Sequence, residues 1–350
     1  MAAIPLRYAE LPLSAQTAYA ELLDQARAGE LRRSVAHLNG SFASKSVKGR
    51  DYWYFAYRDI DGAVRQLYVG PDDERVRALI ARFRERPARP LAPMARAAVA
   101  LGCAAAVPKQ FRIVRRLAEY GFFRAGGVLI GTHAFVCLGN ALGVRFSDGA
   151  VTLDVDFAHA GNNISVALPA DVKVDVHKAI DSLEMGFLPI TELQGGEGAT
   201  YLNPTDPELR LDFLTPMTRA SEKVVHVENL NIALQPLKFM EFSLENVHQA
   251  ALVSEEGAIV VNVPAPARFA VHKLIVHGER AGSFRTKANK DLLQAAALIE
   301  YLADRQPETL QEAWQDATSR GPGWKKRAHQ GRNALVKLNP PVPGIDLLTD

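Results

Sequence analysis

The segment VTLDVDFAH, at residues 151–159, constrains the fold of this chain more than any other part of the sequence. Its apolar and polar residues alternate, which is the pattern of a β-strand with one buried face. Asp154 and Asp156 are two residues apart, so both carboxylates leave the same face of that strand. Aspartate is a poor strand former, and adjacent carboxylates raise each other's pKa. The pattern therefore predicts a strand with one acidic face, on which a bound cation would relieve the repulsion.

A third acid follows the same pattern later in the chain. In ELRLDFLTP, Asp212 stands on the polar face of another alternating strand. If this strand lies beside 151–159, three carboxylates converge, which is enough to hold two metal ions. Oxygen ligands alone suit a hard cation, so we expect Mg²⁺ or Mn²⁺. The alternative is an exposed strand face that carries acids without binding anything, and Arg210 is interpreted as a surface charge.

Gly131 and Thr132 form a second candidate element. They separate an apolar strand at 127–130 from a helix that we expect to start near His133. The free N–H groups at the start of a helix bind phosphate, and a glycine lets the phosphate approach closely. The threonine hydroxyl can donate one further hydrogen bond. We therefore expect a phosphate-binding turn here, although a glycine turn by itself is a common feature.

Hydrophobic periodicity predicts the remaining elements. Ser14 is expected to cap a helix over 14–31. Two aromatic strands are joined at Ile60, Asp61 and Gly62, and the preceding segment is expected to add a third strand. Further helices are expected in these places: after Gly70-Pro71, around 94–105, 109–120 and 171–184, and as three helices after Pro264. Further strands are expected in ATYLN and within 224–263.

Composition narrows the classes of function. The net charge of +2 permits a nucleic-acid partner but does not indicate one. Cys103 and Cys137 both stand in apolar surroundings, so we expect two buried thiols and no zinc site. The N-terminus lacks the pattern of a signal peptide, and the longest apolar stretch is too short to span a bilayer. These features predict a cytoplasmic protein that does not enter a membrane.

The segments LIGT, LDVDF and RLDFL, in this order, resemble the signature of the DNA polymerase β-like nucleotidyltransferase superfamily. The chain is most similar to bacterial nucleotidyltransferases of the NTP_transf_8 kind, relatives of the AbiEii/MenT toxin-like enzymes. RFAVHKL and KANKDLLQA support this similarity. Three departures stand out: Thr132 replaces the usual serine, the gap from Thr132 to Asp154 is long, and Gln294 stands where the toxin-like enzymes often have an acid.

The resemblance implies roles for residues in the C-terminal part. The Lys-x-x-x-Asp segment, Lys287 to Asp291, contributes to nucleotide binding in the toxin-like relatives. Lys287 would neutralise the triphosphate and Asp291 would orient it, with Lys290 as an alternative to Lys287. Lys273 is a further candidate for phosphate contact. The competing interpretation is that Lys287 and Asp291, four residues apart on a helix, form a surface ion pair of little energetic value.

The expected fold is of the α+β (α/β) class. It has a polymerase β-like nucleotidyltransferase core on a mixed sheet, an N-terminal β-hairpin and helical region, and a C-terminal helical bundle. The expected boundaries are 1–118 for the N-terminal region, 119–263 for the catalytic domain, 264–335 for the helical domain and 336–350 for the tail.

The expected activity is metal-dependent transfer of a nucleoside monophosphate from an NTP to an acceptor hydroxyl, with release of pyrophosphate. Asp154, Asp156 and Asp212 would hold the metal, and Gly131 and Thr132 would cradle the phosphates. The acceptor could be tRNA, another RNA or a protein. Two alternatives stay open: a glycosyltransferase that uses a nucleotide sugar, which leaves Asp212 unexplained, and a non-catalytic nucleic-acid-binding or toxin–antitoxin regulatory protein.

Overall fold

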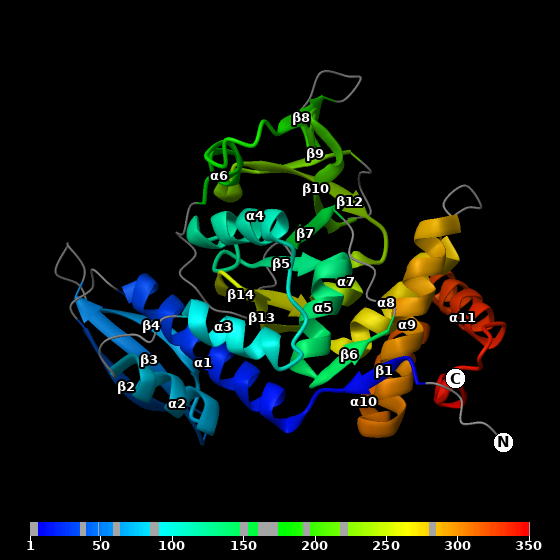
Figure 1. The fold of residues 1–350 in the computed structure, drawn as a ribbon, viewed down its shortest axis with the longest axis horizontal. Coiled ribbons are helices and arrows are strands. Elements are labelled where there is room, and N and C mark those ends of the chain that lie inside the picture. The colour runs from blue at the N-terminus through cyan, green and yellow to red at the C-terminus, as the bar shows by residue number, and fades with distance from the viewer. Residues whose placement is uncertain are drawn as a thin grey trace.

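The structure is a computed structural model, and it describes most of the chain. The described residues are 6–35, 40–47, 49–58, 64–84, 91–147, 153–159, 174–191, 197–217, 223–279 and 285–349. The predicted turn at Ile60, Asp61 and Gly62 lies outside them. The described elements confirm the predicted mixture of helices and a mixed sheet. In Figure 1 a small sheet of strands lies at the left, a group of helices lies at the right, and α5 lies between them.

The small N-terminal sheet contains the two predicted aromatic strands and the predicted third strand. It is antiparallel in the order β2 (Gly40–Val47), β3 (Arg50–Arg58), β4 (Val64–Pro71). The helix predicted after Gly70-Pro71 is α2 (Glu74–Arg84), and the Asp73 carboxylate accepts a hydrogen bond from the Val76 amide at its start. Alternating aromatic residues therefore fold locally as expected.

Helix α1 (Leu13–Val35) differs from the prediction at its start. The amides of Ala15 and Gln16 donate to the Pro12 carbonyl, so the helix has already begun at Ser14. Ser14 therefore lies in the first turn and is not the cap. Pro12 stands at the entry to the helix, a position that proline readily occupies. Helix α1 packs on α3 (Leu91–Ala100), and Ala15, Tyr19 and Leu22 of α1 share a buried cluster with two alanines of α3.

The central sheet places the predicted acidic strands side by side. Its strand order is β11–β12–β10–β7–β5, and β9, which pairs with β8, also pairs with β10. Its strands are β5 (Gly127–Ile130), β7 (Val155–His159), β8 (Leu188–Thr191), β9 (Glu197–Asn203), β10 (Asp206–Pro216), β11 (Val225–Val227) and β12 (Ile232–Leu237). The described helices beside it are α4 (Pro108–Glu119), α5 (Gly131–Ala141), α6 (Val176–Asp181), η1 (Glu228–Leu230) and α7 (Met240–Leu244).

Strand β10 runs parallel to β7 and antiparallel to β9. On one face of β7 and β10, Phe157 and Phe213 stack with ring centroids 5.1 Å apart. Phe122 packs edge-on against both rings. This apolar face anchors the strands in the core, and the polar residues that alternate with the two phenylalanines point to the opposite face.

The remaining elements include more helix than the sequence predicted. Short strands β1 (Tyr8–Glu10) and β6 (Val144–Phe146) pair, as do β13 (Val247–Ser254) and β14 (Gly257–Pro264). The C-terminal helices are α8 (Pro266–Glu279), α9 (Arg285–Arg305), α10 (Pro307–Ser319), α11 (Pro322–Val336) and the short η3 (Ile345–Leu347). Helix α11 was not among the three helices expected after Pro264, and Pro322 stands at its start, a position that proline favours.

The hydrophobic core is continuous through most of the described chain. One cluster of buried residues extends from Tyr8 to Leu348 and includes residues on both sides of each expected domain boundary. The boundaries themselves stay predictions. Cys103 and Cys137 are free and buried, as expected. Among the described helices, none combines the length and the apolar character needed to cross a membrane.

Candidate active site

The structure brings Asp156 and Asp212 together on one face of the central sheet. They are direct partners in the parallel ladder of β7 and β10, so their side chains leave adjacent positions on the same face. Asp154 lies just before β7, and its charge also acts on Asp156. The sequence placed these acids on polar faces, and the strand pairing decides that the faces coincide.

The Asp156 carboxylate has a perturbed pKa. Burial, followed by the nearby charges of Asp212 and Asp154, raises its pKa to about 6, although Lys273 and Lys287 act in the opposite direction. The raised pKa means that the site disfavours the negative charge that Asp156 must carry. A cation bound at these oxygens would remove that penalty.

Asp212 is held by two hydrogen bonds. The Thr200 hydroxyl, on the neighbouring strand β9, donates to Oδ1 at 2.7 Å, and Arg210 donates from Nη2 to Oδ2 at 2.7 Å. The Asp212 side chain is only 14% exposed, whereas the Arg210 side chain is 38% exposed. Arg210 is therefore not merely a surface charge, and the hydrogen bond to Asp212 raises its pKa. Sequence reasoning missed Thr200, because only the register of β9 reveals it.

The lysines predicted for nucleotide binding lie near the acids, and their ion pairs differ from the surface pair of Lys287 with Asp291 that was the competing interpretation. The ammonium of Lys287 lies 3.5 Å from Asp154 Oδ2. Asp291 instead pairs with Lys273 at 2.6 Å, and both side chains are largely buried. Helical spacing places Lys287 and Asp291 on one side of α9, but packing against α8 and against the sheet gives each a different partner.

Lys290 differs in its contacts from Lys273 and Lys287, which each lie beside a carboxylate. Its ammonium nitrogen is buried and has no hydrogen-bond partner within the described part of the chain. Burial, followed by the charge of Lys273, lowers its pKa, while Asp154, Asp156 and Asp291 act in the opposite direction. An anion that entered the site would meet this ammonium without first breaking a hydrogen bond.

Two further polar side chains, His133 and Gln294, lie near this cation. The His133 imidazole hydrogen-bonds to the backbone of Asp154, and burial lowers its pKa to about 4, so the ring is neutral at neutral pH. Gln294 stands one helical turn after Lys290 and is fully buried. Neither His133 Nε2 nor the Gln294 amide has a hydrogen-bond partner among the described residues. In the sequence, Gln294 stands out only as a departure from the toxin-like pattern.

The turn at Gly131 and Thr132 is tighter than predicted, because α5 begins at Gly131 itself and not near His133. Gly131 has φ of +65°, a region that favours glycine. A Cβ atom at this position would lie 2.1 Å from Asp156 Oδ2, so a larger residue would displace that carboxylate. The first N–H groups of α5 have no intrahelical partner, so they can donate hydrogen bonds to a phosphate that is bound beside the acids.

The donor set fits a hard divalent cation, although the side chains are not arranged as a complete metal site. In the described ranges, no three His, Cys, Asp or Glu side chains lie close enough together to hold a metal ion. Both Asp212 oxygens instead accept bonds from Thr200 and Arg210. A carboxylate oxygen has two lone pairs, so Asp212 can keep these bonds and still bind a metal. The raised pKa of Asp156 is the feature that a cation would relieve.

The part of the chain that contains these residues matches a known family. The model of the family NTP_transf_8, described as nucleotidyltransferase, matches residues 109–319, which is more than half of the chain. A crystal structure of an antigenic nucleotidyltransferase-like protein from Paracoccidioides brasiliensis is similar at 14% identity and a TM-score of 0.29, over 65% of this chain and 95% of that chain. No curated protein matches significantly. The match over 109–319 contains all three aspartates and the Gly131 turn, and the chain belongs to the NTP_transf_8 family of nucleotidyltransferases.

Proposed function

We propose that the protein transfers a nucleoside monophosphate from an NTP to an acceptor hydroxyl and releases pyrophosphate, with Mg²⁺ or Mn²⁺ bound by Asp154, Asp156 and Asp212. The observation that carries the proposal is the register of β7 and β10, which makes Asp212 the direct neighbour of Asp156. The cation supplies charge neutralisation at the phosphates when it is bound. Kinship with the AbiEii/MenT toxin-like enzymes is part of the proposal.

The phosphates would lie between α5 and α9. The N–H groups at Gly131 and Thr132 would donate to the outer phosphates, and the ammonium groups of Lys287 and Lys290 would neutralise them. Lys273 is already paired with Asp291, so we assign this pair to holding α8 against α9 beside the phosphates. His133, which bonds to the Asp154 backbone, would fix the position of that acid.

The reaction needs no covalent intermediate. The acceptor oxygen forms a bond to the α-phosphorus, the bond from that phosphorus to the bridging oxygen of the β-phosphate breaks, and pyrophosphate leaves. The proton of the acceptor hydroxyl passes to a carboxylate of the site and then to water. Asp212, oriented by Thr200 and Arg210, would position the acceptor oxygen. Catalysis by positioning and charge neutralisation is the general mode of phosphoryl transfer.

Labelled substrates test this proposal. Each labelled NTP is incubated with the protein, Mg²⁺ and cell RNA or lysate, and nucleotide sugars are tested in parallel. The Asp212→Asn variant lacks one of the proposed metal-binding carboxylates, so its kcat should fall about 100-fold or more. Asp304→Asn is the matched control, because the Asp304 side chain is 61% exposed. Transfer of a sugar, or NMP transfer by Asp212→Asn at the parent rate, would refute the proposal.

A further inference from the structure

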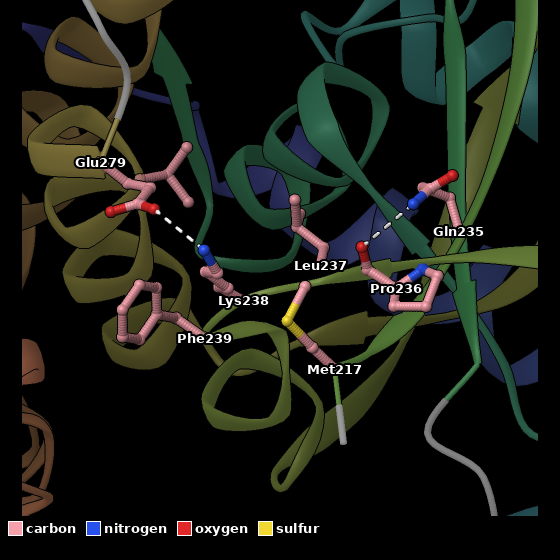
Figure 2. Close-up of a pocket in the computed structure, with 8 residues that line it drawn as sticks. Met217, Gln235, Pro236, Leu237, Lys238, Phe239 and Glu279 are labelled. Atoms are coloured by element: carbon pink, nitrogen blue, oxygen red, sulfur yellow. Dashed lines mark hydrogen bonds and ion pairs between the residues drawn. The ribbon is translucent and has the colours of Figure 1, made fainter. Parts of the chain in front are cut away.

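Two pockets of the structure differ in how their charged side chains are paired. The pocket beyond Asp212, of about 370 Å³, lies between the end of β12 and the last turns of α8 (Figure 2). Its two charged residues, Lys238 and Glu279, lie 4.0 Å apart, so their charges compensate each other. The second pocket, of about 150 Å³, is lined in part by Arg27, whose charge is compensated less completely.

The second pocket lies where the N-terminal elements meet the central part of the chain. Leu31 of α1, Tyr68 of β4 and Leu79 of α2 form one side of it. The other side includes Phe123, which follows α4, and Val260 of β14. Most of this lining is apolar, and a ligand in the pocket would contact both parts of the chain at once.

Arg27 brings an unsatisfied cation to this pocket. The guanidinium has five N–H donors, and within the described ranges it donates one hydrogen bond, from Nη2 to the Gln249 carbonyl at 3.2 Å. Its Nη1 lies 3.9 Å from Asp24 Oδ1, which is too far for a hydrogen bond. Burial lowers the pKa of Arg27, and the charge of Asp24 opposes this shift without cancelling it. The side chain is 20% exposed, so an anion in the pocket can reach it.

The other two charged residues of the lining are paired with each other. Arg124 Nη1 lies 2.9 Å from Glu30 Oε2, and both side chains are largely buried. With Arg27, the lining therefore holds two positive charges and one negative charge, a net charge of +1. A ligand with a single negative charge matches this excess, whereas a phosphate dianion would leave one negative charge without a partner.

One wall of the pocket is held in place by hydrogen bonds. The Asn262 side chain is 4% exposed, and its Nδ2 donates to the carbonyls of Phe123 and Gly127 at 2.8 and 2.9 Å. These bonds fix β14 against the segment that leads into β5. A wall that is already ordered loses little conformational freedom when a ligand binds, so the pocket is suited to a small molecule.

The volume and the lining limit the size and shape of that molecule. A protein cavity of about 150 Å³ is large enough for benzene, so the apolar part of the ligand is about one ring in size. Leu79, Phe123 and Val260 offer this part an apolar surface. The two oxygens of a carboxylate match the N–H groups of a guanidinium, and such charge-assisted hydrogen bonds are strong.

From these observations we infer that the pocket binds a small monocarboxylate with an apolar body about the size of one benzene ring, and that its carboxylate contacts the guanidinium of Arg27. The bound ligand joins the N-terminal elements to the central part of the chain. The inference goes beyond the proposed function and does not depend on it, because binding here requires no NTP.

Titration calorimetry on the full chain tests the inference with two carboxylates. Benzoate carries an aromatic body, and 4-methylpentanoate carries a branched aliphatic one, so the two distinguish the sources of such a ligand. Benzamide is the matched neutral probe, acetate lacks the apolar body, and inorganic phosphate replaces the carboxylate. We expect at least one of the two carboxylates to bind with a Kd of about 1 mM or below. Benzamide, acetate and phosphate should bind at least about 10-fold more weakly.

Variants locate the binding in this pocket. Arg27→Met removes the cation and keeps an apolar stem, and it should weaken carboxylate binding about 10-fold or more. Leu79→Trp fills the pocket from α2 and leaves the charges unchanged, and it should weaken binding to a similar degree. Arg115→Met is the matched control, because Arg115 lies on α4 with a side chain that is 53% exposed, and its affinity should change less than about 2-fold.

Urea denaturation establishes that each variant is folded. The inference is overturned if neither carboxylate binds the parent below about 10 mM, if benzamide or phosphate binds as tightly as the carboxylates, or if a folded Arg27→Met or Leu79→Trp binds like the parent. If Arg27→Met does not fold, Leu79→Trp and the comparison of benzoate with benzamide decide the question. A carboxylate at about ten times its Kd should also raise the unfolding midpoint of the parent, because it binds the folded state.

Discussion

At the scale of single residues, the environment of Asp156 makes its ionised form unfavourable. The carboxylate is buried beside two other acids, and Gly131 approaches it so closely that no side chain fits there. Its pKa rises from 3.8 to about 6, so ionised Asp156 destabilises the folded state. A buried carboxylate with a perturbed pKa at a functional site lowers the stability of the folded state, and a bound ligand can restore that stability.

The first prediction concerns Asp156→Asn. Well below pH 4, Asp156 is protonated in both the folded and the unfolded state, and its burial does not lower stability. Between about pH 4 and 6 the unfolded state loses this proton first, so stability falls as the pH rises and stays lower above pH 6. Asp156→Asn removes this loss and should be more stable than the parent at pH 7.5, by at most about 3 kcal/mol. Urea denaturation at pH 4 and 7.5 measures the difference.

The same variant should lose transfer activity. Mg²⁺ should raise the unfolding midpoint of the parent and leave that of Asp156→Asn almost unchanged, because binding to the folded state alone stabilises it. Equal stabilities of the two proteins at pH 7.5 would show that the Asp156 charge has no such cost.

At the scale of elements, the junction between β5 and α5 determines the geometry of the site. Four apolar residues of β5 are all buried, and the chain turns at Gly131 directly into the helix. Because the helix begins without a spacer, its free N–H groups start at the level of Asp156, the ladder partner of Ile130. A longer loop would separate the phosphate turn from the acids.

The second prediction compares two glycines. Gly131→Ala introduces a Cβ that meets Asp156 Oδ2 and places alanine at positive φ, so we expect a loss of about 1–3 kcal/mol in stability. Activity should fall at least 10-fold, because the carboxylate moves. Gly29→Ala is the control: Gly29 lies within α1, has no atom within 4 Å of the new Cβ, and should gain up to about 1 kcal/mol. Thermal unfolding and NTP turnover measure both variants. A fully active Gly131→Ala would contradict the tight turn.

At the scale of the whole molecule, Arg7 joins helix α9 to the segment that follows α11. Arg7 pairs with Glu300 of α9 at 2.8 Å, and both side chains are buried. Arg7 also donates to the carbonyls of Pro340 and Pro341. The segment after α11 therefore belongs to the core, although its sequence has no helical or strand period.

The third prediction is that removal of residues 339–350 destabilises the protein by about 4 kcal/mol. The truncation deletes the buried side chains of Val342 and Leu348, each worth about 1.5–3 kcal/mol, and two acceptors of Arg7. Removal of Thr349 and Asp350 alone is the control and should change stability by less than about 0.5 kcal/mol. Urea denaturation compares the three proteins. A truncated protein as stable as the parent would mean that the tail contributes little to the core.

Much of the fold could be predicted because its signals are local. The alternation in LDVDF and RLDFL defines which faces are polar, since side chains of a strand alternate regardless of its neighbours. The buried strand 127–130 was predicted at its observed bounds. The errors at Ser14, at the start of α5 and at α11 arose where glycine or proline can either end a helix or begin one.

The sequence by itself determined that Asp156 and Asp212 stand on polar strand faces and that a helix starts at the Gly131 turn, because these properties follow from spacing within one segment. Tertiary structure alone decided the partners: Asp212 with Thr200 and Arg210, Lys287 with Asp154, and Asp291 with Lys273. Each of these contacts except that of Arg210 joins different segments of the chain, and local periodicity carries no information about which elements pack together. The pocket beyond Asp212 likewise exists only because β12 and α8 meet there.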